Sequence, residues 1–387
     1  MDNIYDNPVF YSQMLMFEPL EKWATGEHFE NPSLPLQYFA KGVVLNDDGS
    51  VTFTCDFPNA SSVSVAGLGG SMGEKQYEMS KNPDGLWQVT VHDIAPGFHY
   101  HNYYVDGIQT INPVAPIGYG CFTPINYFDI PDDDSEFYIE KNVPHGEIVM
   151  EQFTCGQNGR TRCCYIYTPP SYHENVDTCY PVLFLQHGVG ENETGWVWHG
   201  HIDNIMDNLI AAGRCREMLI VINSAYVYCD EPIHDLFPGD FEQMLLNDCM
   251  PMLKERYRIL NDRSSFAIAG LSMGSAQAMR TAIRRQDLFA SVGVFSGALP
   301  IVGTDYDGSA YMLNPCLISE KYDVFFIGAG ENEPFWPDTL AKLKELEQNG
   351  AGPALHYSSY PGFHEWDVWR KLARDFICRL FGGGNSL

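Results

Sequence analysis

The segment GLSMG at residues 270–274 limits what this chain can fold into more than any other feature of its sequence. It directly follows the apolar run 264–269 and leads directly into the helical pattern of residues 273–285. A buried strand that passes into a helix this abruptly must turn tightly, so the two glycines leave room for the backbone and the serine projects above the sheet edge. This context predicts a nucleophile at Ser272. The alternative interpretation is a glycine-rich helix start with a capping serine.

The region around this segment alternates short β-branched runs with amphipathic helical patterns, from about residue 146 onward. Strands are expected at 147–153, 161–170, 180–186, 217–224, 264–271, 291–297, 323–330 and 354–360, and helices at 203–213, 240–257, 273–285, 337–350 and 365–380. Such alternation is typical of an α/β fold with a mainly parallel sheet covered on both faces. We therefore predict an α/β-hydrolase domain over residues 146–383.

The N-terminal third has a different pattern, and 387 residues exceed what one hydrophobic core usually serves. Residues 49–57, 61–68, 85–91 and 98–107 alternate with period two and are separated by Asp-Gly and Pro-Gly turns. This pattern predicts an antiparallel, immunoglobulin-like β-sandwich over residues 41–135. Residues 1–40 are expected to form an extended lead-in segment.

The composition restricts the partners. The chain has 50 acidic and 23 basic residues, a formal net charge of −27, which argues against nucleic acid and anionic membranes and fits an uncharged substrate. No apolar run approaches the ~20 residues needed to span a bilayer. The start of the sequence lacks the pattern of a signal peptide, so a cytoplasmic location is expected unless a leader was removed.

The cysteines and histidines give no metal-binding pattern. The eleven cysteines contain no CxxC pair and are interpreted as free thiols in a reducing compartment. His187, His199 and His201 lack a matching carboxylate or cysteine spacing, so we interpret them as loop histidines. No metal and no cofactor are expected, and the oligomeric state is not indicated.

A serine nucleophile requires a base and an acid, which follow it along the chain in the order acid and then histidine. Only His356 and His364 lie downstream of Ser272. His356 falls inside an expected strand, whereas His364 lies in the loop before the last helix, so His364 is the predicted base. The acid is expected in the loop after strand 323–330. Glu333 is the first choice there, with Glu331 and Asp338 as the second and third.

An oxyanion hole needs two backbone N–H groups directed at the reacting carbonyl oxygen. Met273, the residue after the nucleophile, should supply one from the N-terminus of its helix. The other should come from the glycine-containing loop 186–190, where Val189 is the predicted donor and Gly190 the alternative.

Residues 146–383 resemble carbohydrate esterase family 1, which contains feruloyl and acetylxylan esterases, and more distantly the esterase-D and enterobactin-esterase type of α/β-hydrolase. The matching stretches are 186–196, 207–213, 267–279, 287–297, 325–333 and 361–370. The resemblance implies Ser272 as nucleophile and His364 as base. The family's acid is usually an Asp at the position where this chain has Glu333, so a longer side chain stands there.

Four further residues are expected to bind substrate. Gln277 and Trp196 fall on positions that line the site in the family. Trp336 and Trp366 lie close in sequence to the catalytic loops, where an indole could stack on a phenyl ring. Ordinary hydrophobic packing is the alternative interpretation of these tryptophans.

The N-terminal region resembles the immunoglobulin-like, carbohydrate-binding type of module found in glycogen-branching and related enzymes. The resemblance covers about residues 45–130. In that family the module either binds glycan or packs beside the active site. Its aromatic residues could form a sugar platform, but alternating positions in a sandwich more often form its core.

The sequence therefore predicts a serine carboxylic-ester hydrolase that acts on esters of plant-wall polysaccharide, with feruloyl esters of arabinoxylan ahead of acetyl esters. A second interpretation is an esterase for siderophore trilactones of the enterobactin type. The third is not an enzyme: a glycan-binding protein with a catalytically silent hydrolase domain.

Overall fold

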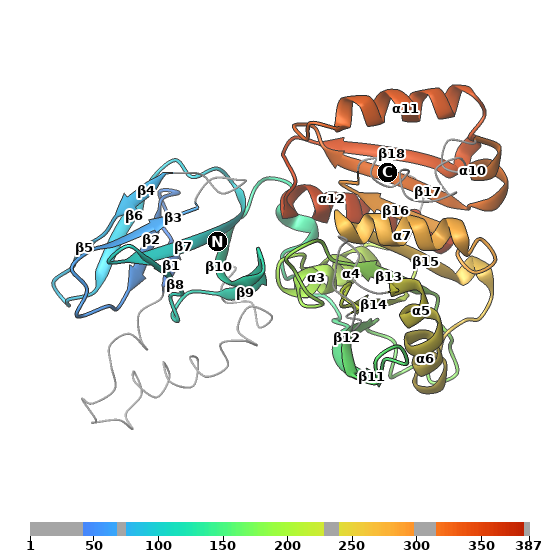
Figure 1. Cartoon of the computed structure of the whole chain (residues 1–387), viewed down its shortest axis with the longest axis horizontal. Helices are drawn as coiled ribbons and strands as arrows, with labels where there is room; N and C mark the ends of the chain where they lie inside the picture. The colour runs from blue at the N-terminus through green and yellow to red at the C-terminus, as the bar shows by residue number, and fades with distance from the viewer. Residues whose placement is uncertain (1–41, 68–74, 228–239, 298–314, 383–387) are drawn as a thin grey trace. The chain divides into compact units, whose positions relative to one another are not determined.

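The computed structural model describes residues 42–67, 75–227, 240–297 and 315–382, which form two compact units divided between Glu136 and Phe137 (Figure 1). The lead-in predicted for residues 1–40 lies outside the described residues. No helix within these ranges combines the length and the apolar character needed to cross a lipid bilayer.

The first unit is a β-sandwich of antiparallel strands. Its strands are β1 (Val43–Leu45), β2 (Val51–Cys55), β3 (Val63–Ala66), β4 (Gln76–Glu78), β5 (Ser80–Lys81), β6 (Trp87–Val91), β7 (Gly97–Val105), β8 (Ile108–Thr110), β9 (Ile117–Gly120) and β10 (Thr123–Ile130). One sheet has the order β1-β2-β6-β5, and the other has the order β4-β3-β7-β10-β9 with β8 paired to β7.

The core of this unit lies between the two sheets. Phe53 of the first sheet contacts Phe128 and His101 of the second, each with ring centroids 5.4 Å apart. Burial lowers the pKa of His101 to about 3, so its ring is neutral and packs as an aromatic side chain. Trp87 and Tyr103 are buried as well, in keeping with the prediction that most of the aromatic residues of this unit form its core.

The second unit is built on an eight-stranded sheet of order β11-β12-β14-β13-β15-β16-β17-β18. The strands are β11 (Glu147–Thr154), β12 (Thr161–Thr168), β13 (Val182–Gln186), β14 (Leu219–Asn223), β15 (Phe266–Leu271), β16 (Ser291–Phe295), β17 (Val324–Gly330) and β18 (Leu355–Tyr360). β11 and β12 pair antiparallel, and β12 pairs antiparallel with β14, while all other neighbours are parallel. This mainly parallel α/β-hydrolase sheet confirms the predicted fold class.

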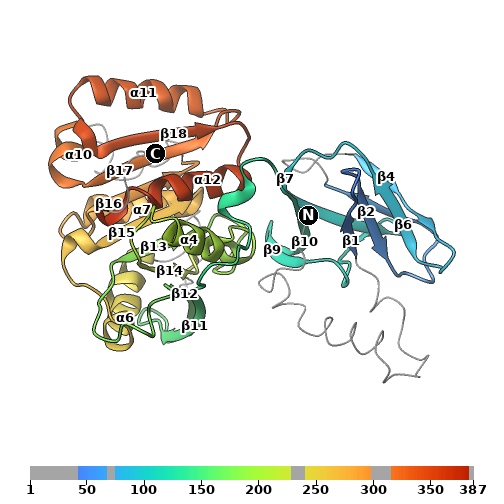
Figure 2. The ribbon, with the colours of Figure 1, turned by 180° about the vertical axis from the view of Figure 1, so that it is seen from behind.

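Helices cover both faces of this sheet. They are α3 (Gly195–Trp198), α4 (Ile202–Ala211), α5 (Phe241–Met244), α6 (Met250–Arg256), α7 (Met273–Arg284), α10 (Pro315–Lys321), α11 (Trp336–Gln348) and α12 (Trp366–Ile377). Side chains of α5, α6, α7, α10 and α11 join one buried cluster with the sheet. Helix α12 packs on the opposite face against β16, β17 and β18, and Figure 2 shows it from that side together with α4.

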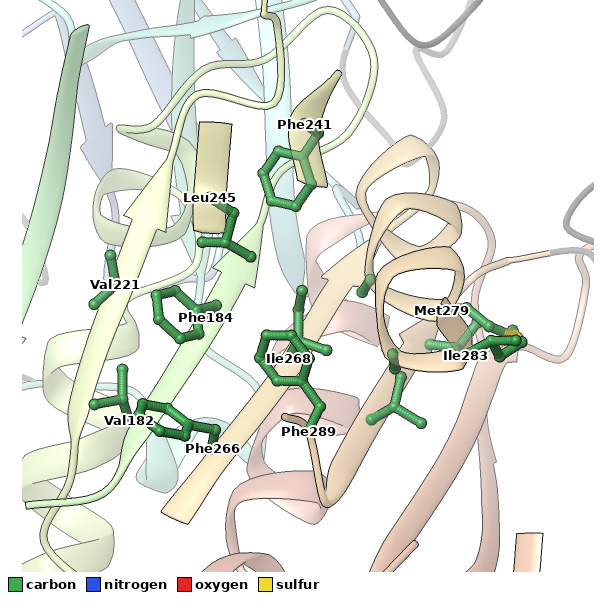
Figure 3. Close-up of a cluster of buried hydrophobic side chains, with 14 of the residues drawn as sticks. Val182, Phe184, Val221, Phe241, Leu245, Phe266, Ile268, Met279, Ile283 and Phe289 are labelled. Atoms are coloured by element: carbon green, nitrogen blue, oxygen red, sulfur yellow. The ribbon is translucent and has the colours of Figure 1, made fainter. Parts of the chain in front are cut away.

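The buried cluster explains why the strand sequences are continuously apolar. Phe184 and Ile268 of neighbouring strands belong to one buried cluster with Met279 of α7 and Leu245, which follows α5 (Figure 3). A strand between two helical layers must be apolar on both faces, which removes the period-two alternation seen in the first unit. Because β13 and β15 to β18 run in the same direction, their carboxyl ends meet at one edge of the sheet, which is where loops of an α/β fold carry functional groups.

Candidate active site

Ser272 lies at the carboxyl edge of the sheet, between the last residue of β15 and the first residue of α7. Its backbone has φ 52° and ψ −118°, a conformation that a residue with a side chain adopts at a cost in energy. The backbone N–H of Ser272 donates to Phe295 O on the adjacent strand at 2.9 Å, which helps to hold this conformation. The side chain of Ser272 is half-buried, while Leu271 and Met273 on either side are buried.

The two glycines of the motif are required by close backbone approach. A Cβ at Gly270 would lie 2.5 Å from the backbone of Gly274, and a Cβ at Gly274 would lie 2.4 Å from His187 O. Neither contact could be relieved by moving a flexible side chain. The crossing of β15, α7 and the loop after β13 therefore needs glycine at both positions.

His364 and Glu333 form a hydrogen-bonded pair. His364 lies in the loop between β18 and α12, and its Nδ1 is 2.8 Å from Glu333 Oε2. Glu333 follows β17 and is 2% exposed, whereas the imidazole is 45% exposed. A carboxylate on Nδ1 keeps the proton there and leaves Nε2 as the basic nitrogen, directed by the ring geometry away from the acid.

Glu333 is held by two further donors. Its Oε1 accepts hydrogen bonds from Gly330 N, at 2.9 Å, and from Ser296 Oγ. Ser296 follows β16, has φ 52°, and accepts a hydrogen bond from Trp369 Nε1 at 2.9 Å. Trp369 also packs its ring edge-on against His364, with centroids 5.1 Å apart. Two donors besides the imidazole thus fix the carboxylate that orients His364.

The loop of the acid and the loop of the histidine are joined through their backbones. Glu331 N donates to Tyr360 O at 2.8 Å, and Asn332 N donates to Gly362 O at 3.0 Å. The two alternative acids lie elsewhere: the carboxylate of Glu331 is exposed and accepts from Ser359 Oγ, and Asp338 is an exposed residue in the first turn of α11. Of the three carboxylates considered, Glu333 is the one that contacts His364.

Sheet register brings this pair to the same edge as Ser272. Leu271 of β15 is paired with Phe295 of β16, and Phe295 is paired with Gly328 of β17. Ser296 is the next residue along, and it contacts the acid directly. Adjacent strands lie roughly 4.8 Å apart, so the ends of β15 and β17 are separated by the width of one intervening strand.

The predicted oxyanion loop forms a tight turn over residues 188–191. Glu191 N donates to Gly188 O at 3.4 Å, and Gly190 has φ 80°, as expected at the third position of a type II turn. A Cβ at Gly188 would lie 3.2 Å from Ser272 Cβ, so the turn lies against the nucleophile. Burial lowers the pKa of His187 to about 4, so its ring is neutral. The Nδ1 atom of this ring contacts Gly188 O at 2.8 Å.

The two candidate donors of this turn are in different situations. Gly190 N donates to Tyr226 Oη at 2.6 Å and is therefore engaged. Val189 N has no hydrogen-bond partner within the described part of the chain, and the side chain of Val189 is 37% exposed. Val189 remains the candidate donor, together with Met273 at the first position of α7.

The residues predicted to bind substrate lie in the interior. Trp196, Trp336 and Trp366 are at most 4% exposed, so no ring face is open for stacking on a phenyl group. Trp196 donates to Gln186 O at 2.9 Å, and its ring packs edge-on against Trp366 with centroids 5.2 Å apart. The packing interpretation therefore describes these tryptophans, and stacking on substrate finds no support in their positions.

Gln277 is also buried, at 4% exposed, and its Nε2 donates to Ala225 O at 2.9 Å. This contact fixes the loop that follows β14, in which Tyr226 lies. Gln277 is therefore a buried residue that supports the site by holding the backbone of that loop.

Four residues at the site were missed by the sequence: Glu191, Tyr226, Ser296 and Trp369. Their side chains contact the oxyanion turn or the histidine-acid pair. Glu191, Ser296 and Trp369 fall inside stretches that resemble the esterase family, but the resemblance assigned a role to none of the four residues. Among the described residues, no cluster of three or more His, Cys, Asp or Glu side chains is arranged to hold a metal ion.

Comparison with known proteins gives one family and several relatives. The model of the Esterase family, described as "Putative esterase", matches residues 157–376. The chain is 30% identical over 348 residues to an endo-1,4-beta-xylanase/feruloyl esterase of Xylanibacter ruminicola, an alignment that covers 87% of this chain and 46% of that protein. The chain spans about half the length of the curated relatives it matches.

Solved structures share the fold at lower identity. A ferulic acid esterase of Anaeromyces mucronatus aligns with a TM-score of 0.51 and 20% identity, covering 65% of this chain and 96% of that one. The enterobactin esterase of Shigella flexneri aligns with a TM-score of 0.58 and 13% identity, covering 85% of this chain and 92% of that one.

Proposed function

Because the chain belongs to the Esterase family, we propose that it is a serine carboxylic-ester hydrolase that acts on feruloyl (hydroxycinnamoyl) esters of plant-wall polysaccharide. The observation that carries the proposal is the 2.8 Å contact between His364 Nδ1 and Glu333, at the sheet edge where Ser272 follows β15. A histidine oriented in this way is a general base for a nearby serine hydroxyl.

In the proposed reaction Ser272 Oγ attacks the ester carbonyl, and His364 Nε2 takes its proton. The same proton passes to the departing sugar hydroxyl, which leaves an acyl-serine. A water molecule then attacks this acyl group with His364 as base, the bond from the acyl carbon to Ser272 Oγ breaks, and His364 returns the proton to Oγ as the free acid is released. Glu333 stabilises the imidazolium in both steps.

The negative charge that develops on the carbonyl oxygen requires donors that are in place beforehand. The backbone N–H groups of Met273 and Val189 would supply them. Met273 N also lies at the N-terminus of α7, whose aligned peptide dipoles favour negative charge.

Three observations support a feruloyl ester as substrate. The Xylanibacter ruminicola relative carries feruloyl esterase in its name and aligns with most of this chain. Val189 and Phe363, which adjoin the two halves of the site, are 37% and 45% exposed and offer apolar surface for a hydroxycinnamoyl ring. The net charge of −27 suits an uncharged sugar better than an anionic substrate.

The test compares wild type with Ser272→Ala on methyl ferulate, feruloylated arabinoxylan fragments, acetylated xylan and p-nitrophenyl acetate. We expect ferulate release by the wild type and a loss of several orders of magnitude in the variant. Release of acetate from xylan without release of ferulate would reject the acyl preference. If the wild type hydrolysed none of these esters and failed to react with a fluorophosphonate, the esterase proposal would be wrong and a glycan-binding role would replace it.

An esterase for siderophore trilactones is the second candidate, because the enterobactin esterase aligns with 85% of this chain, more than the hydrolase unit alone. Its anionic iron-loaded substrate fits poorly with the acidic composition of this chain. Turnover of enterobactin at a higher kcat/KM than methyl ferulate would decide in its favour.

A further inference from the structure

Glu191 is a buried acidic residue that the proposed reaction does not use. It is 6% exposed and ends the turn that begins at Gly188. Its own Oε2 accepts a hydrogen bond from Gly188 N at 3.1 Å. The side chain therefore closes the turn a second time, in addition to the backbone bond from Glu191 N to Gly188 O.

The same carboxyl group reaches a second element. It accepts a hydrogen bond from the side chain of Trp366, the first residue of α12. Both side chains lie beside Gly195. A Cβ on this residue would be 3.3 Å from the Trp366 ring and 3.8 Å from Glu191 Oε2. Trp366 is two residues after His364, so Glu191 connects the oxyanion turn to the helix that follows the proposed base.

The bonds to Glu191 come from neutral N–H groups. Burial raises the pKa of Glu191 to about 7, because water no longer stabilises its charge and the two neutral donors compensate only in part. A carboxyl group with a pKa of about 7 is only about half ionised at neutral pH, so it opposes a developing oxyanion nearby less than a fully ionised carboxylate would.

We propose that Glu191 is a positioning residue for ester hydrolysis: its carboxyl group fixes the turn that presents Val189 N–H to the oxyanion and ties that turn to α12 behind His364. The inference rests on the proposed esterase function but is independent of the acyl group. A residue in this role acts on the transition state, where the oxyanion exists, and has little effect on the ground-state ester.

The experiment uses p-nitrophenyl acetate and four variants of the full chain. Glu191→Leu removes the acceptor, Glu191→Gln keeps a carbonyl oxygen for Gly188 N–H, and Trp366→Phe keeps an aromatic ring but removes the indole N–H. Glu193→Leu is the matched control, since Glu193 lies two residues away and contacts Cys163 Sγ, at 2.8 Å, on β12. Circular dichroism and the thermal midpoint establish that each variant is folded.

We expect Glu191→Leu to lower kcat by roughly ten- to a hundredfold with KM within about twofold, as removal of support for an oxyanion donor should. Glu191→Gln should stay within about threefold of wild type, Trp366→Phe should be intermediate, and Glu193→Leu should match wild type. Inhibition by a trifluoromethyl ketone, which forms a tetrahedral oxyanion adduct, should weaken in Glu191→Leu by the factor lost in kcat.

Three results would overturn the proposal: an unchanged kcat in Glu191→Leu, a loss in Glu191→Gln as large as in Glu191→Leu, or a loss that appears in KM alone. If Glu191→Leu does not fold, the comparison of Glu191→Gln with Trp366→Phe still decides, because the proposal requires the tryptophan variant to be slower. An inactive wild type would instead reject the esterase function itself.

Discussion

Glu333 occupies a position where the resemblance to carbohydrate esterase family 1 implies an Asp, and its extra methylene changes how the acid must be held. A longer side chain has one more rotatable bond, so it needs more contacts to present one oxygen to His364. The structure supplies them through Gly330 N and Ser296 Oγ on the opposite oxygen. With Oε1 held by these two donors, Oε2 is left to contact His364 Nδ1 at 2.8 Å.

This arrangement predicts different results for two substitutions of the acid. Glu333→Gln keeps the size but replaces an acceptor with an amide, which disfavours the Nδ1–H tautomer of His364, so kcat should fall by roughly 10³–10⁴. Glu333→Asp keeps the charge but retracts it from His364, so a smaller loss of roughly ten- to a hundredfold is expected. Steady-state kinetics on methyl ferulate at neutral pH measures both. Equal losses in the two variants would contradict the assigned role.

Ser296 offers a test of the support behind the acid. Ser296→Ala removes the hydroxyl that donates to Glu333 and accepts from Trp369, so kcat should fall by about tenfold, the equivalent of one hydrogen bond to a charged group. KM should change little, because the substrate does not contact this hydroxyl. Ser359→Ala is the control, since Ser359 bonds the exposed carboxylate of Glu331 at 3.3 Å. A control variant as slow as Ser296→Ala would show that the loss is unspecific.

The roles of site residues could be predicted from the sequence where a motif or a fixed chain order exists. Roles without either were predicted wrongly or were missed. Ser272 was assigned from its motif, and His364 and Glu333 were assigned from chain order; the structure places all three at one sheet edge, with the acid in contact with the imidazole. Trp336 and Trp366 were assigned from closeness to catalytic loops, and Trp196 from a position that lines the site in the family it resembles. A residue's distance along the chain from a loop does not reveal which way its side chain points, and these rings point into the core.

At the level of elements, the crossing of β15 with α7 depends on glycine more than on any side chain. Gly274→Ala would put a Cβ 2.4 Å from His187 O, a backbone atom that cannot rotate away. We expect a loss of about 3 kcal/mol or more in unfolding free energy, comparable with other severe steric changes in a core. Chemical denaturation followed by circular dichroism gives the value.

Gly213→Ala is the control for Gly274→Ala, because it changes the backbone preference at a glycine without creating a steric clash. Gly213 follows α4 with φ 64°, and a Cβ there would meet nothing within 4 Å. Only the left-handed conformation is penalised, at about 1 kcal/mol. If Gly213→Ala cost as much as Gly274→Ala, close backbone approach would not be the reason for the motif glycine.

Elements of the second unit were predictable to the extent that their periodicity was strong. All eight strands, and helical structure in all five places where a helix was expected, lie where the alternation of apolar runs indicated. The helix expected at 240–257 is interrupted by a π-helical turn at Leu245–Cys249, which no sequence period distinguishes from α-helix. The short helix α10 was missed, as were the three-residue strands β4 and β8 of the first unit, because so few residues show no detectable period.

For the molecule as a whole, one buried carboxyl should couple stability to pH. Burial raises the pKa of Asp203 to about 7, and the nearby carboxylate of Asp207 acts in the same direction. The folded chain therefore keeps this proton in a range where the unfolded chain, with the ordinary pKa of 3.8, has released it. Stability must then fall as pH rises from about 4 to about 7, by about 1.4 kcal/mol per pH unit from this group.

Asp203→Asn should remove that contribution. The variant should gain thermal midpoint relative to wild type as pH is raised from 4 to 8, with the difference growing up to about pH 7 and constant above it. Differential scanning fluorimetry across this range measures it, and Asp177→Asn, at an exposed position, serves as control. A difference between Asp203→Asn and wild type that is independent of pH would show that Asp203 does not carry this proton.

The backbone bonds from Glu331 to Tyr360 and from Asn332 to Gly362 have a consequence for how such an enzyme could diverge. These bonds join the loop of the base to the loop of its acid, so a displacement of one loop moves the other as well. The turn at residues 188–190 is not tied to either loop by backbone bonds in the described chain. New substrates could therefore be accommodated by changes outside these two loops, which leave the groups that move the proton in place.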